Sequence, residues 1–364
     1  MWLIILGAVM IALVFGMIYL IACVGRFSII QKISGGDKWR RRGLSFLILA
    51  VVFSILTITI SLMNAIIVFL HLVLFFLLFG LAAQIIERYT GKQSMINRQG
   101  WLALGFCAVY LTAAYGFCHH VWQKDYTLQT DKELGTLKIA LIADSHLGTT
   151  FDGEGFARHL KTIEAQSPDL LMIAGDFVDD GSNREDLLRA CEAFGETHFP
   201  YGVWYAYGNH DSGYFRSRDF TAEDLEEALR QNGVHVLSDD YETVGDRLIV
   251  AGRQDAMVRT RKDMGTLLSG IDTDKYIIVL DHEPNDYENE SLSPADLVLS
   301  GHTHGGQLIP ITYIGKWFGL LDRVYGHENR RGTDFIVTSG ISDWEIQFKT
   351  GTRSEYVLIT VEGK

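Results

Sequence analysis

The segment 139–146 reads Ile-Ala-Leu-Ile-Ala-Asp-Ser-His, an apolar run that ends in residues able to bind metal. Four further segments have the same form, and they end in Asp176, in Asn209-His210-Asp211, in His282, and in His302-Thr303-His304. An apolar run of about four to six residues is typical of a buried strand. In α/β sheets, ligands bind beyond the carboxyl ends of the strands. The five segments therefore predict a sheet that gathers Asp, His and Asn side chains at one edge, where they can hold metal.

The kinds of side chain at this edge indicate which ions would bind and how many. Carboxylate, imidazole and amide oxygen suit divalent Mn, Fe or Zn. Seven ligands are too many for one ordinary site and suit two ions that share Asp176; the candidates are Asp144, His146, Asp176, Asn209, His282, His302 and His304. Two ions about 4 Å apart can clamp a phosphoryl group, which a hydroxide bridging them attacks. His210, flanked by Asp211, is suited to protonating the leaving oxygen.

The remaining pattern of this half of the chain predicts a layered α/β domain. Apolar runs predict strands at 137–143, 170–174, 202–207, 248–251, 277–280, 297–299, 335–338 and 356–361. Helices are expected at 154–166, 184–194 and 221–231, and Thr221 with Asp224 fits a capping box at the start of the third. Because strands alternate with helices early and dominate later, we expect a sheet-rich α/β layered architecture.

The first part of the chain is different, because it contains four apolar stretches long enough to span a bilayer. They are Leu3–Val24, Leu44–Met63, Ala65–Ile86 and Trp101–Phe117. Basic residues gather between the first and second stretches and between the third and fourth. Positive loops favour the cytoplasm, so everything after the fourth stretch is expected on the extracytoplasmic side of the plasma membrane.

Charge divides the chain at the same place. Up to Asp125 there are 10 Lys and Arg against 3 Asp and Glu, and from Tyr126 onward there are 22 against 41. A polyanion-binding domain needs a basic face, so the acidic second half argues against a nucleic-acid partner. We expect a four-span transmembrane domain at 1–125, a linker at 126–136 and a catalytic domain at 137–364.

The order and spacing of the polar endings resemble the calcineurin-like metallophosphoesterase family over roughly residues 137–362. The matching elements are Asp144-x-His146, Gly175-Asp176-x-x-Asp179, Gly208-Asn209-His210-Asp211, the single His282, and Gly301-His302-x-His304. The run 301–307, Gly-His-Thr-His-Gly-Gly-Gln, further resembles the bacterial membrane-associated phosphodiesterase-like subgroup.

This resemblance implies a β-sandwich of two sheets flanked by helices and a metal-dependent phosphoric ester hydrolase, with manganese among the candidate metals. It implies one ion held by Asp144, His146, Asp176 and His304, and another held by Asp176, Asn209, His282 and His302. His210 would be the catalytic histidine, paired with Asp211 or Asp179. The chain departs from the family pattern at Ile346-Gln347, where the family often has Pro and Arg.

The substrate is less sharply indicated than the reaction. The run 313–321 is apolar with one charge, follows the last histidine motif and lies in a membrane-tethered domain. It is either a lip that enters the membrane interface and admits a lipid or cell-envelope phosphodiester, or a packed β-hairpin that covers a sheet edge. Two other functions stay open, a metal-binding sensor without turnover and an accessory membrane module. The sequence does not indicate an oligomeric state.

Overall fold

The computed structural model describes residues 2–91, 97–214, 217–309, 317–319 and 321–364. The chain divides into two compact units, Met1–Ala114 and Tyr115–Lys364. Each unit has its own contacts and is described by itself.

The first unit is helical. Its elements are α1 (Trp2–Val24), α2 (Ser28–Ile33), α3 (Lys38–Ile60), α4 (Leu62–Thr90) and most of α5 (Arg98–His119). Helices α3, α4 and α5 are long and apolar enough to cross a membrane, and α1 adds a shorter apolar stretch, Val9–Val24. Large apolar side chains such as Ile58 and Val109 are exposed along them, which suits a lipid surrounding. Among the described residues, three of the four expected spans are therefore long and apolar enough to cross a membrane, and the first is represented by a shorter apolar stretch.

The second unit contains two six-stranded sheets. The first has the order β1-β12-β2-β3-β4-β5, with β1 (Trp122–Gln129), β2 (Thr136–Ile142), β3 (Leu170–Ala174), β4 (Val203–Ala206), β5 (Val234–Leu237) and β12 (Glu355–Glu362). The second has the order β10-β11-β9-β8-β7-β6, with β6 (Asp240–Val244), β7 (Leu248–Gly252), β8 (Tyr276–Leu280), β9 (Leu297–Ser300), β10 (Gly326–Arg330) and β11 (Thr333–Val337). Strands β2 to β5 are mutually parallel, as are β7 to β9, so their carboxyl ends point the same way within each sheet.

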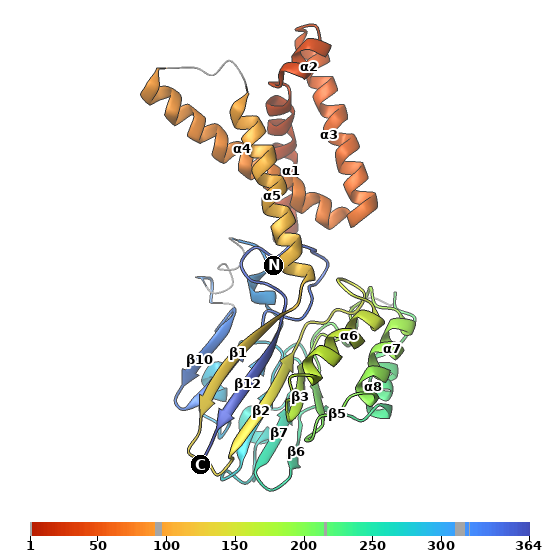
Figure 1. The fold of residues 1–364 in the computed structure, drawn as a ribbon, viewed down its shortest axis with the longest axis vertical. Coiled ribbons are helices and arrows are strands. Elements are labelled where there is room, and N and C mark those ends of the chain that lie inside the picture. The colour runs from red at the N-terminus through yellow and green to blue at the C-terminus, as the bar shows by residue number, and fades with distance from the viewer. Residues whose placement is uncertain (1, 92–96, 215–216, 310–316, 320) are drawn as a thin grey trace. The chain divides into compact units, whose positions relative to one another are not determined.

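The two sheets pack face to face, and helices cover their outer sides. Leu141 and Met172 of the first sheet share a buried apolar cluster with Leu280 and Leu299 of the second. On the other side of the first sheet lie α6 (Gly153–Glu164), α7 (Arg184–Gly195) and α8 (Ala222–Gln231), which share a second apolar cluster with it (Figure 1). The short helices α9 (Met264–Leu267) and α10 (Tyr287–Glu290) contribute to a third cluster on the outside of the second sheet. The expected two-sheet sandwich flanked by helices is confirmed.

The predicted linker contains more structure than expected. Residues 126–129 are the second half of β1, which pairs in parallel with β12 from Trp122↔Glu355 to Gln129↔Glu362. This strand reads Trp-Gln-Lys-Asp-Tyr-Thr-Leu-Gln and buries only Leu128 fully. An edge strand needs little apolar sequence, so it lacks the run that marks the inner strands. The capping box at Thr221 is present, with Asp224 bonded reciprocally.

Candidate metal centre

The candidate ligands all follow the carboxyl ends of parallel strands. Asp144 and His146 follow β2, Asp176 follows β3, and Asn209 and His210 follow the first sheet's β4. In the second sheet, His282 follows β8, and His302 and His304 follow β9. The face-to-face packing therefore brings loops from both sheets to one edge of the sandwich.

Six of these side chains form two groups that could each hold an ion. One group is Asp144, His146 and His304, and the other is Asp176, His282 and His302. Within each group the candidate ligand atoms all lie within 4.8 Å of one another. The structure thus brings together residues that the sequence predicted and divides them between two candidate sites. That they bind metal stays a prediction.

Asp176 faces both groups. Its Oδ2 lies 3.1 Å from Nε2 of His282 and 3.7 Å from Nε2 of His146. Burial alone would raise its pKa, but the neighbouring histidines, His282 first, hold the pKa of Asp176 far below its usual range. Asn209, the seventh candidate, has its Oδ1 2.9 Å from Nδ1 of His302, which places it beside the second group. The sharing of Asp176 between two ions stays a prediction.

Unpaired nitrogen atoms at the centre test whether the residues fit metal ions. Among the described residues, Nε2 of His146 and Nε2 of His282 are buried without a hydrogen-bond partner. A buried polar atom without a partner costs free energy. Divalent cations would satisfy these nitrogens, and imidazole with carboxylate is a donor set that suits Mn, Fe or Zn. The residues therefore fit a pair of divalent ions.

The backbone at this edge is unusual. Five of the seven candidate ligands have a positive φ, which is uncommon for residues other than glycine: Asp144 (54°), His146 (37°), Asp176 (52°), His302 (68°) and His304 (48°). Such conformations cost roughly 1–3 kcal/mol each for residues other than glycine and cluster at functional sites. The rest of the fold therefore imposes these backbone conformations.

Two glycines permit the close approach of the loops. A Cβ added at Gly175, whose φ is 81°, would lie 2.6 Å from the backbone nitrogen of Gly208 and 2.7 Å from Nδ1 of His282. A Cβ at Gly301 would lie 2.7 Å from Oδ2 of Asp144. Larger residues at either position would push a ligand loop away from the centre.

Asp211 has a different place from the one expected. Both of its oxygens accept hydrogen bonds from backbone N–H groups, those of Asp176, Phe177, Val178 and Gly208, at 2.8–3.1 Å. Burial, with the charge of Asp176 next, raises the pKa of Asp211 to about 6. These contacts give Asp211 a place in holding the loop after β3, next to Asp176; its expected catalytic role beside His210 stays a prediction.

His210 stands at the centre but without the expected carboxylate partner. Its Nδ1 is buried and unpaired among the described residues, and its ring lies 5.0 Å from that of His146. Asp179, the other expected partner, has its Oδ2 3.5 Å from Nδ1 of His146 instead. The backbone N–H of His210 donates to Oδ1 of Asp176 at 2.8 Å. Burial lowers the pKa of His210, which makes a proton on this ring easier to transfer.

Several neighbours of the centre carried no recognisable sequence signal. The Tyr214 hydroxyl accepts from Nδ2 of Asn209 at 2.6 Å, and the Trp344 ring lies 5.6 Å from the His210 ring. Asp343 has its Oδ1 3.1 Å from Nδ1 of His304. The nearest sequence cue was the departure from the family pattern at Ile346-Gln347, a few residues beyond Trp344.

The structure combines an α/β sandwich with two groups of Asp and His residues that could each hold an ion. This combination is typical of metal-dependent hydrolases. The family model described as calcineurin-like phosphoesterase matches residues 137–306. An uncharacterized metallophosphoesterase of Aquifex aeolicus is 31% identical over 249 residues, which cover 66% of this chain and 91% of that protein. The chain belongs to the calcineurin-like metallophosphoesterase family and is a metal-dependent phosphoric ester hydrolase.

Other relatives cover more of the chain. A Danio rerio protein described as a transmembrane protein with metallophosphoesterase domain is 30% identical over 289 residues, 73% of this chain and 63% of that protein. The uncharacterized metallophosphoesterase YkuE of Bacillus subtilis is 26% identical over 295 residues, 76% of this chain and 99% of its own length. The chain therefore spans under two thirds of the zebrafish relative and nearly all of the Bacillus one.

Proposed function

We propose that the chain is a membrane-anchored phosphodiesterase that uses two divalent ions and acts on a lipid or another cell-envelope phosphodiester outside the cytoplasm. The position of Asp176 between the two groups supports the dinuclear assignment most directly. The basic residues between the apolar helices support the orientation, and the acidic catalytic half argues against a nucleic-acid substrate.

Each residue of the centre has a distinct proposed role. When bound, the ions would supply Lewis acidity, which activates the attacking water and neutralises charge on the phosphoryl oxygens. Asp144, His146 and His304 hold one ion, while His282, His302 and Asn209 hold the other, and Asp176 contributes to both. His210 donates a proton to the leaving oxygen, which lowers the barrier to departure. Tyr214 fixes the amide of Asn209 so that its oxygen faces His302.

A turnover assay separates this enzyme from a metal-binding sensor. With Mn²⁺ added, we expect the full chain in detergent to hydrolyse bis-p-nitrophenyl phosphate, and to hydrolyse p-nitrophenyl phosphate more slowly. Chelation should remove both activities, and added Mn²⁺ should restore them. Absence of metal-dependent hydrolysis of either ester would favour the sensor, and a preference for the monoester would overturn the phosphodiesterase assignment.

The lipid hypothesis depends on the run 313–321, of which only residues 317–319 and 321 are described. The expected lip or hairpin at 313–316 and 320 lies outside the described residues. Trp317 and Phe318 are 71% and 75% exposed. Two large exposed apolar side chains, one of them Trp, suit a membrane interface, and this exposure favours the lip over a packed hairpin.

Replacement of Trp317 and Phe318 by serine should separate lipid from soluble substrates. We expect activity on a phosphodiester lipid in liposomes to fall about tenfold or more, because burying two aromatic side chains is worth several kcal/mol. Hydrolysis of bis-p-nitrophenyl phosphate should stay within about twofold. Leu188→Ser on α7, also an exposed apolar residue, is the matched control and should change neither. An equal loss on both substrates would remove the lipid hypothesis.

A further inference from the structure

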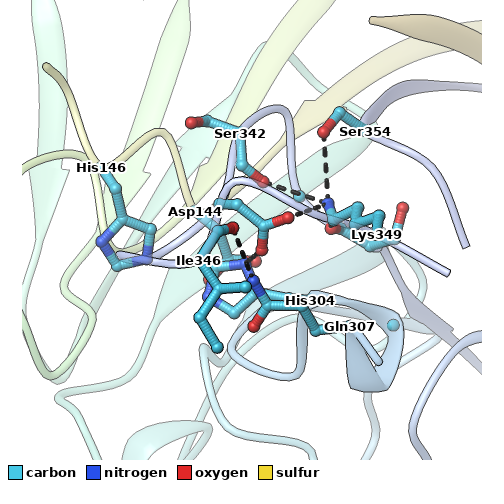
Figure 2. A network of polar contacts seen from close by, with 12 residues as sticks. Asp144, His146, His304, Gln307, Ser342, Ile346, Lys349 and Ser354 are labelled. Carbon is cyan, nitrogen blue, oxygen red and sulfur yellow. Dashed lines mark hydrogen bonds and ion pairs between the residues drawn. The ribbon is translucent and has the colours of Figure 1, made fainter. Parts of the chain in front are cut away.

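The charged side chain of Lys349 is fully buried. Its Nζ donates to the backbone oxygens of Ser339 (2.6 Å) and Ser342 (3.1 Å) and to Oγ of Ser354 (3.3 Å), and the bonds to Ser342 and Ser354 are visible in Figure 2. A buried cation is costly unless it is paired and hydrogen-bonded. The site described above does not use this ammonium group directly, so it requires an explanation.

The buried ammonium is paired with Asp343, which reaches the metal centre. Oδ2 of Asp343 lies 3.7 Å from Nζ of Lys349, and Oδ1 lies 3.1 Å from Nδ1 of His304. A histidine that binds metal usually turns its other ring nitrogen toward a carboxylate, which fixes the orientation of the ring. The ammonium group of Lys349 lies beside the other oxygen of the same carboxylate.

The loop at 339–342, whose backbone oxygens accept hydrogen bonds from Lys349, is also hydrogen-bonded to the backbone of the first candidate ion site. The N–H groups of Ile341 and Ser342 donate to the carbonyl oxygens of Ala143 and Asp144, at 2.9 and 3.3 Å. Further along, Nε2 of Gln307 donates to the Ile346 oxygen at 2.9 Å, which ties the turn after His304 to the same loop (Figure 2). Asp144 and His304 both belong to one group of candidate ligands.

The bracing continues to the end of helix α5. The Cys118 thiol donates to Oδ2 of Asp343 at 3.4 Å, and the Cys118 carbonyl accepts from Oγ of Ser354 at 2.6 Å. Lys349, Asp343, Ser354 and Cys118 thus form a closed ring of contacts, and each residue is fully buried.

We propose that Lys349 and Asp343 are positioning residues for one ion site, formed by Asp144, His146 and His304, and that the other ion site is independent of them. The proposal rests on the two-ion assignment of the proposed function. It also gives a role to the loop around Ile346-Gln347, where the chain departs from the family pattern. Through Asp343, this loop would fix the orientation of the His304 ring.

Metal binding by the full chain in detergent tests the proposal without any substrate. In Lys349→Met and in Asp343→Asn, we expect the affinity for one of two Mn²⁺ ions to fall about 10- to 100-fold, while the other stays within about threefold of wild type. At two Mn²⁺ per chain, electron paramagnetic resonance should then show the hyperfine sextet of an isolated ion instead of a spin-coupled pair. Lys132→Met is the matched control, because Lys132 also pairs with a carboxylate, that of Asp296, and should leave both affinities unchanged.

The outcomes separate the alternatives. Folded variants that keep both affinities, or that lose both equally, overturn the proposal. If Lys349→Met fails to fold, Asp343→Asn decides by the same criterion, and failure of both to fold indicates a general structural role and also overturns it. A wild-type chain that binds two ions but hydrolyses no phosphodiester would overturn only the proposed function, whereas a wild-type chain that binds fewer than two would overturn both.

Discussion

Asp176→Asn should lower kcat/KM on bis-p-nitrophenyl phosphate by about a thousandfold or more. The Asp176 carboxylate lies beside histidines of both groups, and an amide offers neither its charge nor a second carboxylate oxygen. Losing several kcal/mol of charge stabilisation in the transition state corresponds to this factor, at about 1.4 kcal/mol for each tenfold. Metal analysis should show fewer than two Mn²⁺ per chain under conditions that saturate wild type.

Asp296→Asn is the matched control for the loss of a carboxylate. Asp296 accepts from the backbone N–H of Ile277 and pairs with Lys132, and it belongs to neither candidate ligand group. We expect this variant to keep both its metal and its activity. If Asp176→Asn keeps near wild-type turnover, the assignment of a shared carboxylate is wrong.

His210→Gln should affect catalysis while leaving both ions bound. General acid catalysis contributes typically 10²- to 10⁴-fold, so kcat should fall by about that factor when the leaving group is an alkoxide that needs a proton. With p-nitrophenolate, which departs without help, the loss should be much smaller. The comparison requires steady-state kinetics on two phosphodiesters that differ only in the leaving group, an alkoxide in one and p-nitrophenolate in the other. The metal content of the variant would be measured alongside.

His327→Gln is the control for this second prediction, since His327 pairs with Asp334 on β10 and β11 and belongs to neither ligand group. Its kinetics should match wild type. Equal losses on both esters in His210→Gln would show that this histidine binds substrate or metal rather than donating a proton.

Within the part of the chain that the structure describes, the sequence predicted the eight inner strands of the two sheets and missed the four edge strands. Inner strands such as β3 and β8 are buried along their whole length, so they appear as continuous apolar runs. The missed strands β1, β5, β6 and β10 are the edges of the two sheets. Two of them are largely polar: β6 reads Asp-Tyr-Glu-Thr-Val and β10 reads Gly-His-Glu-Asn-Arg. An edge strand is half solvated, so polar residues are tolerated in it, and such a sequence cannot be distinguished from that of a loop.

The candidate ligands could be predicted because each directly follows an apolar run, and strand direction alone places such residues at one edge. The partners of these residues could not. Asp343 reaches His304 from 39 positions away in the sequence, and Cys118 lies 225 positions from Asp343. Two neighbours in the sequence can also point to different partners. Asp211 directly follows His210, yet its carboxylate accepts hydrogen bonds from the backbone after β3. Such contacts depend on loop conformation, which local sequence does not determine.

The place of β12 in the first sheet has a consequence for biosynthesis. β12 lies between β1 and β2, so the strand that directly follows helix α5 meets the rest of its sheet only through residues 355–362. While the ribosome is still making the chain, the segment that emerges just after the last apolar helix has no neighbour to pair with. The first sheet therefore closes only after translation has passed residue 362, and until then a nascent chain exposes unpaired strand edges of the kind that chaperones protect.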